Sequence, residues 1–398
     1  MFFILISISK CVGPIFSVPG ILYSKLYSTI TNPLNFPECE KFPKSKTQIW
    51  PIPNTTQTTY EENWKCISTL LDTISYENGS IGSPEGVIIE SDPITKSKVP
   101  YFSKFDNTFR VYYDWIHFYT GINSTFQALK EKIQHEVEQT KNHEKAIISG
   151  YSLGGAFVRY FLTHYVDEEW KSKYIESAMF FAAGVGGSFF SSASIGVGKM
   201  FGILDMDKKA VNSPFIRHMP SLYSMLPNFP TNKRKSIFNG RPFGASEIFN
   251  EMIKISEESK GEIIEFKNKN KENFSVNFSV VIDDTSKKIY NANLPFLEED
   301  ILDPGVRTLI VFNSGMKVIC GFNITQINPH HYEYEIFECG GDNIISSDGV
   351  EYASKHWKNV VFHDFNSTDH KFLHEEISFS KELADYIIEF IGDDNTEL

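Results

Sequence analysis

The sequence of 398 residues lacks three features that would each define its class. It has no apolar run of the roughly 18 residues that a membrane-spanning helix needs, which favours a soluble or peripheral protein. Its net charge is −12, and its one basic run, Lys233–Lys235, is short, which argues against nucleic-acid binding. It has no metal-binding or phosphate-binding motif, and His330–His331 reads as a loop pair, so neither a metal nor another cofactor is expected.

Cysteine is scarce, with five residues in the chain. The apolar start, Met1–Ser9, is followed by a polar break, which predicts a short signal peptide over residues 1–12, with a buried first strand as the alternative. If Cys11 leaves with that peptide, four cysteines remain, enough for two disulfides in an oxidising compartment. Seven Asn-x-Ser/Thr sequons agree with a glycosylated chain. We therefore expect a secretory-pathway protein, either secreted or in a lysosome-like lumen, with the ER lumen as the alternative.

Short apolar strands alternate with amphipathic helices along much of the chain. Phe126, Leu129, Ile133 and Val137, for example, recur at helical spacing. The expected core elements are strands at 14–18, 109–113, 146–148, 308–312, 334–337 and 359–362, and helices at 126–137, 155–165 and 381–391. Such alternation predicts an α/β fold with a mostly parallel central sheet covered on both faces.

Two stretches interrupt this alternation. Residues 32–105 are rich in Pro, Thr, Ser and Asn, and residues 188–303 contain Gly- and Ser-rich turns, Pro-rich loops and a candidate hairpin around 273–278. We interpret them as a cap and a lid inserted into one domain that spans residues 13–398.

Gly150-Tyr151-Ser152-Leu153-Gly154 matches the pattern G-x-S-x-G, with an apolar strand before it and a helix after it. This is the nucleophile turn of the α/β-hydrolase fold, in which the serine hydroxyl stands above the sheet edge. The glycines are needed because a side chain at either position would strike the neighbouring backbone. The pattern predicts Ser152 as the nucleophile of a serine hydrolase.

A serine hydroxyl needs a histidine base and an acid that orients the base, and in this fold they follow in the order serine, acid, histidine. His356 falls in a helical stretch and His363 ends a strand, which leaves His370 and His374 in the loop before the last helix. His370 is preferred and His374 is the alternative. For the acid, Asp342 follows a strand and two glycines, and it is preferred over Asp348, which reads as a turn residue.

An oxyanion hole requires backbone N–H groups close to the nucleophile. One is expected from Leu153, the residue after Ser152. The other is expected from Ile21, in the loop that follows the first strand at Pro19–Gly20.

Several segments together resemble the lecithin:cholesterol acyltransferase family, whose members include lysosomal phospholipase/transacylases and phospholipid:diacylglycerol acyltransferases. The resemblance is carried by the segments Val18–Leu22, Cys39 to Cys66 with Trp50 between them, Tyr113–Trp115, Gly150–Gly155, Trp170–Ile175 with Gly186–Ser188, and the positions of Asp342 and Thr368–His370. It implies a disulfide between Cys39 and Cys66 that closes a loop bearing Trp50.

The resemblance also implies acyl transfer from a glycerophospholipid through an acyl-Ser152 intermediate. Water as acceptor would make the protein a phospholipase, and a sterol or another lipid alcohol would make it an acyltransferase. Trp50 is expected to contact a membrane or lipoprotein-like surface, and Phe189 and Phe190 are expected to lie in a lid over the acyl groove. Two alternatives stay open: a carboxylesterase or neutral lipase, and an inactive hydrolase that binds lipid.

Overall fold

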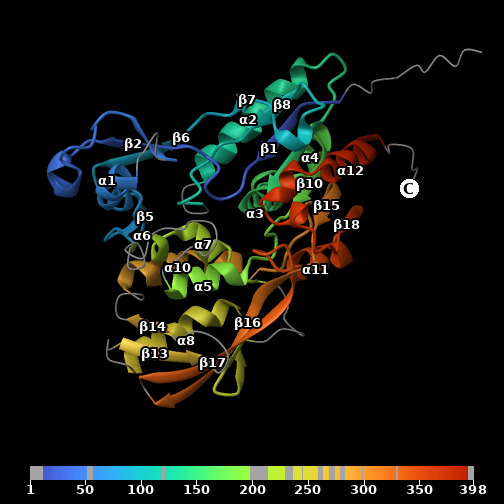
Figure 1. The fold of residues 1–398 in the computed structure, drawn as a ribbon. Coiled ribbons are helices and arrows are strands. Elements are labelled where there is room, and N and C mark those ends of the chain that lie inside the picture. The colour runs from blue at the N-terminus through green and yellow to red at the C-terminus, as the bar shows by residue number, and fades with distance from the viewer. Residues whose placement is uncertain are drawn as a thin grey trace, which may run out of the picture.

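The computed structural model of this chain is shown in Figure 1. It describes residues 12–51, 57–118, 122–197, 214–228, 236–243, 245–258, 263–268, 274–277, 283–297, 299–328 and 330–392. The predicted signal peptide therefore lies outside the described residues, apart from its last position. In the described part of the chain, no helix has both the length and the apolar character needed to cross a bilayer.

A seven-stranded sheet forms the centre of the fold, in the order β18-β15-β10-β9-β1-β8-β7. All neighbours pair in parallel except β7 with β8 at one edge. The strands are β1 (Ile15–Val18), β7 (Thr95–Lys96), β8 (Thr108–Arg110), β9 (Ala146–Tyr151), β10 (Ile175–Phe181), β15 (Arg307–Phe312) and β18 (Val360–Asp364). The expected mostly parallel α/β fold is confirmed. Its central strands read as continuous apolar runs because both faces of the sheet are covered.

Neighbouring residues of a strand pack against different helices. Ile148 joins the core under α2 (Asn123–Gln139), α3 (Leu153–Tyr160) and α11 (Asp348–His356), whereas Ile147 joins the core under α12 (Lys381–Gly392). Side chains of a strand alternate between faces, so one buried strand supplies both cores. A π-helical turn, Phe161–Tyr165, continues α3, and α4 (Glu168–Tyr174) leads into β10.

The first inserted segment builds a small unit beside the central sheet, drawn in blue in Figure 1. Its sheet has the order β3-β2-β6, and a two-stranded ribbon, β4 with β5, follows α1. The disulfide between Cys39 and Cys66, implied by the resemblance, is present and joins the η2 turn to α1. The elements are β2 (Leu26–Ile30), η1 (Pro33–Asn35), η2 (Pro37–Cys39), β3 (Thr47–Trp50), α1 (Gln57–Leu70), β4 (Ile74–Ser75), β5 (Ile81–Gly82), β6 (Val87–Ser91) and η3 (Pro100–Phe102).

A second sheet of six strands, in the order β12-β11-β16-β17-β13-β14, lies at the bottom of Figure 1. Its strands are β11 (Ser236–Phe238), β12 (Arg241–Phe243), β13 (Ile263–Asn268), β14 (Phe274–Asn277), β16 (Met316–Asn328) and β17 (His331–Gly341). The accompanying helices are α5 (Phe189–Val197), α6 (Pro214–Arg217), α7 (Pro220–Ser224), α8 (Ala245–Glu258) and α10 (Asp284–Leu297). The second sheet thus takes strands from both sides of β15 in the sequence.

The core strand expected at 334–337 is a wrong prediction. These residues belong to β17, which pairs antiparallel with β16 in the second sheet. Buried Tyr334 is followed by exposed Glu335 and a half-exposed Phe337. This mixture suits a strand with one face toward solvent and not a strand covered on both sides.

The β16–β17 hairpin leaves the central sheet and returns to the place where it left. Met316, soon after the end of β15, lies opposite Gly341 in the ladder. Asp342 therefore emerges at the carboxyl end of β15, although it lies 29 positions after Asn313.

The second disulfide that four cysteines suggested does not form between Cys320 and Cys339. Cys339 lies opposite Val318, and the Cys320 thiol is 3.5 Å from the Phe337 carbonyl oxygen. In the described residues the Cys39–Cys66 bond is the one disulfide recorded.

Candidate active site

Ser152 stands on the sharp turn between β9 and α3, with φ 55° and ψ −124°. Two glycines make that turn possible. A Cβ on Gly150 would lie 2.3 Å from the Gly154 carbonyl oxygen, and a Cβ on Gly154 would lie 2.3 Å from the Val18 carbonyl oxygen. The turn therefore has the crowding that the G-x-S-x-G pattern implies, and it stores strain at the serine.

A line of hydrogen bonds runs from Ser152 through His374 to Asp342. His374 Nε2 lies 2.9 Å from Ser152 Oγ, and His374 Nδ1 lies 2.7 Å from Asp342 Oδ2. All three residues are buried, and Asp342 has no exposed surface. This arrangement allows the imidazole to accept the serine proton while the carboxylate holds the ring in place.

The prediction that His370 contacts the serine is wrong, and the alternative, His374, occupies that position. His370 is exposed and begins a 3-10 turn, His370–Phe372, which the Asp369 side chain caps through the Lys371 N–H. The turn carries the chain inward, so that the His374 N–H donates to the Asp342 carbonyl oxygen over 2.8 Å. One sequence signal favours this result, because His374 follows Phe372–Leu373 whereas His370 stands between charged residues.

Asp342 is held from several sides, as expected for the acid. Its Oδ1 accepts the N–H groups of Ile344 and Ile345 at 3.1 and 2.7 Å, which leaves Oδ2 for the histidine. These two bonds from backbone N–H groups fix the orientation of the carboxylate. Asp348, the rejected candidate, lies in the first turn of α11.

Tyr151 connects the nucleophile turn to the histidine loop. Its hydroxyl donates a hydrogen bond to the His374 carbonyl oxygen, and its ring meets the edge of Tyr23. Burial, followed by the nearby phenol of Tyr23 and carboxylate of Asp342, raises the pKa of the Tyr151 hydroxyl well above its usual range. The hydroxyl therefore stays protonated and remains a donor.

The two residues expected to supply the oxyanion hole flank Ser152. Leu153 is next in the chain and begins α3. Ile21 follows Gly20, whose Cα faces the serine, since a Cβ there would lie 2.8 Å from Ser152 Cβ. The role of their N–H groups stays a prediction.

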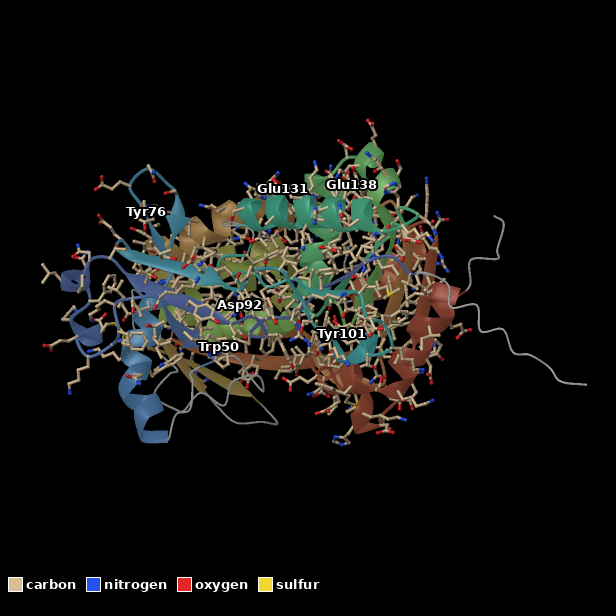
Figure 2. The ribbon with its side chains drawn as sticks, turned by 90° about the horizontal axis from the view of Figure 1, so that it is seen from above. Trp50, Tyr76, Asp92, Tyr101, Glu131 and Glu138 are labelled. Atoms are coloured by element: carbon tan, nitrogen blue, oxygen red, sulfur yellow. A yellow bond between two sulfur atoms is a disulfide. The ribbon has the colours of Figure 1, made fainter. Side chains whose placement is uncertain are left out.

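Trp50 is not at the surface, which overturns its expected place at a membrane interface. Trp50, labelled in Figure 2, is 8% exposed. Its Nε1–H donates to the Leu22 carbonyl oxygen over 2.7 Å, and its ring meets Trp115 edge-on. Phe189 is buried and Phe190 half-buried at the start of α5. Contact of these two residues with substrate stays a prediction.

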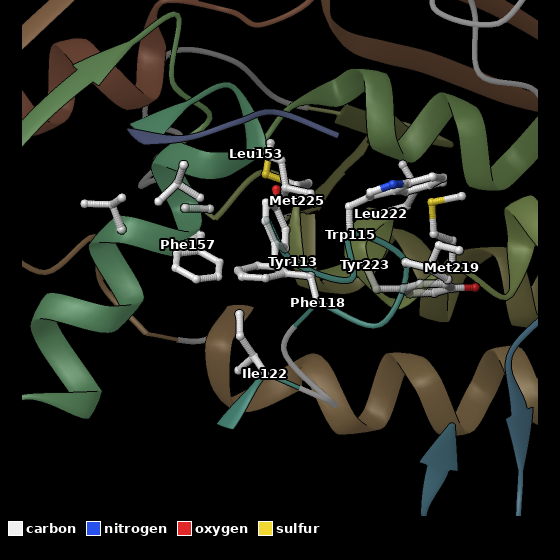
Figure 3. Close-up of a cluster of buried hydrophobic side chains, with 14 of the residues drawn as sticks. Tyr113, Trp115, Phe118, Ile122, Leu153, Phe157, Met219, Leu222, Tyr223 and Met225 are labelled. Carbon is white, nitrogen blue, oxygen red and sulfur yellow. The ribbon is translucent and has the colours of Figure 1, made fainter. Parts of the chain in front are cut away.

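The helix after the nucleophile packs into an apolar cluster, shown in Figure 3. The ring of Phe157 lies 4.9 Å from that of Tyr113 and 6.2 Å from that of Phe118, measured between centroids. Leu153 belongs to the same buried core. In the described part of the chain, no group of three His, Cys, Asp or Glu side chains is arranged to hold a metal.

A mostly parallel sheet with a serine on the strained turn between a buried strand and a helix defines an α/β hydrolase. Within this class, the sequence matches the family described as lecithin:cholesterol acyltransferase over residues 102–307. That match covers more than half of the chain, so the protein belongs to this family. Membership indicates lipid acyl transfer or hydrolysis as the general activity.

A solved structure agrees with this fold. A chain of the Tle4–Tli4 complex superposes with a TM-score of 0.52 at 11% identity, over 97% of this protein and 100% of that chain. The rice cell wall degrading esterase LipA from Xanthomonas oryzae gives a TM-score of 0.35 at 8% identity, over 74% of each chain. The search of curated protein sequences found no match.

Proposed function

We propose that this protein is a serine acyl-hydrolase or acyltransferase that cleaves an acyl ester of a glycerophospholipid through an acyl-Ser152 intermediate. The observation that carries the proposal is the hydrogen-bonded line Ser152–His374–Asp342. Family membership supports a lipid ester as substrate.

In this mechanism His374 Nε2 takes the proton from Ser152 Oγ as the oxygen attacks the ester carbonyl carbon. The tetrahedral oxyanion is stabilised by N–H groups of Leu153 and the Gly20–Ile21 segment. His374 then gives its proton to the departing alcohol, which leaves the acyl group on Ser152. In the second half, His374 deprotonates the acceptor as its oxygen attacks the acyl carbon, and then returns the proton to Ser152 Oγ as the bond from the acyl carbon to Oγ breaks. Asp342 balances the imidazolium charge in both halves.

The acceptor is water for a phospholipase and a sterol or other lipid alcohol for an acyltransferase.

We further propose that the protein works at a membrane surface inside the secretory pathway. The Cys39–Cys66 disulfide supports an oxidising compartment. Treating the mature protein from a secretory host with a glycosidase tests this assignment, since a glycosylated chain becomes lighter.

The test of the activity is acyl release from phospholipid vesicles that contain a sterol, with Ser152→Ala as the control. Ser152-dependent fatty acid without steryl ester identifies a phospholipase, and steryl ester identifies an acyltransferase. If Ser152-dependent cleavage occurs only with a soluble short-chain ester, the substrate is a simple ester and not a phospholipid. Absence of fluorophosphonate labelling at Ser152 would contradict the proposal.

A further inference from the structure

Three aromatic side chains hold the loop Pro19–Ser24, which runs past the nucleophile. The Tyr113 hydroxyl donates to the Pro19 carbonyl oxygen over 3.1 Å, and Trp115 Nε1–H donates to the Ser24 carbonyl oxygen over 3.1 Å. Trp50 Nε1–H donates to the carbonyl oxygen of Leu22, between them, over 2.7 Å. Three carbonyl groups of one short loop are thus fixed by donors from outside it.

The three donors come from two parts of the chain. Tyr113 and Trp115 follow β8 and belong to the buried core of the main domain. Trp50 ends β3, inside the loop that the Cys39–Cys66 disulfide closes. Trp50 also meets Trp115 edge-on, with 5.7 Å between ring centroids. The inserted cap therefore reaches the nucleophile loop through the Trp50 side chain.

Leu22 has φ +70°, in the left-handed region that a leucine rarely adopts. Such a conformation costs of the order of 1 kcal/mol and persists only where surrounding contacts enforce it. The hydrogen bond from Trp50 acts on the carbonyl group of this same residue. It acts together with the turn bond from the Tyr23 N–H to the Gly20 carbonyl oxygen, over 3.4 Å, to keep Leu22 in its strained conformation.

The conformation of Leu22 matters because the residues before it lie against Ser152. The Cα of Gly20 faces the serine side chain, within the space that one added carbon would fill. If Leu22 relaxed, the peptide groups from Gly20 to Leu22 would turn, and their N–H groups would change direction.

We infer that Trp50 is a positioning residue that sets the oxyanion loop for catalysis, so that the disulfide-closed cap controls turnover directly. The inference rests on the proposed acyl-Ser152 mechanism. Oxyanion-hole bonds strengthen in the transition state, so their misplacement lowers kcat with little change in KM. A residue that merely contacts a membrane or substrate would instead change KM.

The experiment compares Trp50→Phe with Trp64→Phe on a soluble short-chain ester, which removes membrane binding from the measurement. Trp64 lies between the same two cysteines and packs edge-on against Phe215, so it is the matched control. Fluorophosphonate titration counts the active sites, and kcat is expressed per titrated site. We expect Trp50→Phe to lower kcat about tenfold, less than the loss of an oxyanion donor itself, with KM within about twofold of wild type. Trp64→Phe should leave both constants unchanged.

A second variant, Leu22→Val, tests the same idea without touching Trp50. A β-branched residue tolerates positive φ poorly, so kcat should again fall with KM retained. An unchanged kcat per titrated site in both variants, or a rise in KM alone, would overturn the inference. If the wild-type protein were neither labelled nor active on any ester, the proposed function itself would fail, which is a different result.

Discussion

The hydroxyl of Tyr151 donates a hydrogen bond to the backbone carbonyl oxygen of His374. The residue immediately before the nucleophile therefore holds the residue that activates it. This bond joins β9 to the loop before α12, two parts of the chain that are 223 positions apart. Because Tyr151 is joined to Ser152 by a peptide bond and to His374 by this hydrogen bond, it helps to set the distance between the serine and the histidine.

Replacing Tyr151 by Phe removes this donor while keeping the ring. The His374 carbonyl group loses a buried partner, which costs about 1 kcal/mol of folding free energy. The histidine should also be less well placed, so we expect kcat to fall about three- to tenfold with KM unchanged. Steady-state kinetics and urea unfolding measure the two effects separately. Equal kcat in both proteins would show that the bond does not position the histidine.

Two histidine variants separate the observed site from the one expected from the sequence. His374→Ala should lower kcat by about four orders of magnitude, because the serine loses its base. His370→Ala should retain kcat within about twofold, because its side chain is exposed. Ester hydrolysis per folded molecule is the measurement. Loss of activity in His370→Ala and not in His374→Ala would reverse our assignment.

Gly20→Ala would place a methyl group against the nucleophile. The added Cβ would lie 2.8 Å from Ser152 Cβ and 3.3 Å from its Oγ, so either the serine or the loop must move. We expect kcat to fall by about two orders of magnitude, comparable with the loss of an oxyanion donor. Gly82→Ala is the control, since its nearest contact would be an ordinary 3.8 Å. Fluorophosphonate labelling rates provide the measurement, and similar rates for both variants would count against this geometry.

His218 lies between two carboxylates that belong to different inserted segments. Its Nδ1 is 2.9 Å from Asp72 Oδ1, and its Nε2 is 2.7 Å from Asp283 Oδ2. Burial by itself would lower the pKa of His218, but hydrogen bonds to Asp283 and Asp72 outweigh it and raise the pKa to about 9. The imidazolium therefore joins the end of α1 to the start of α10.

This cluster predicts a loss of stability at alkaline pH. The folded pKa of His218 is above the unfolded value, so the stabilisation is complete below about pH 6.5 and disappears as pH rises through about 9. At neutral pH it amounts to roughly 2 kcal/mol. Urea unfolding at several pH values, compared with His218→Gln, measures it. The difference between the two proteins should shrink above pH 9, and a constant difference would refute the prediction.

Arg159 lies on α3, the helix that follows the nucleophile, and its charged side chain is buried in the protein core. It has no exposed surface, its three guanidinium nitrogens have no hydrogen-bond partner among the described residues, and it lies 4.9 Å from the centre of the Phe296 ring. Burial lowers the pKa of Arg159 to about 10. Because an unpaired buried charge is costly, Arg159→Met should raise the free energy of unfolding by about 1–3 kcal/mol. Thermal unfolding tests this, and destabilisation of that size would contradict it.

The sequence predicts several strands of the central sheet, because strands covered on both faces read as apolar runs. It misses β10, whose apolar run is interrupted by Glu176 and Ser177. The segment 334–337 was misassigned because its length and apolar content also fit a core strand. Its ladders with β13 and β16 assign it to the second sheet. Local pattern thus identifies a strand more readily than it identifies the sheet to which the strand belongs.

The same limit applies to the site. The nucleophile and the acid follow from short patterns around Ser152 and Asp342. The choice between His370 and His374 depends on the 3-10 turn His370–Phe372, which carries the chain inward. The sequence of so short a segment does not predict the direction of the chain after it. Trp50 suits an interface by its chemistry, and its contacts with Leu22 and Trp115, both distant in the sequence, show that it belongs inside.

The paired ends of the β16–β17 hairpin make that part of the chain a module. Because Met316 and Gly341 face each other where the hairpin leaves and rejoins the main domain, insertions confined to the turn between the two strands should leave Asp342 in place. Changes along the strands themselves would disturb their pairing with β11 and β13. A foreign peptide inserted at this turn would therefore leave Asp342 in position to hold His374. The length of this turn can likewise vary in evolution while the position of Asp342 stays constant.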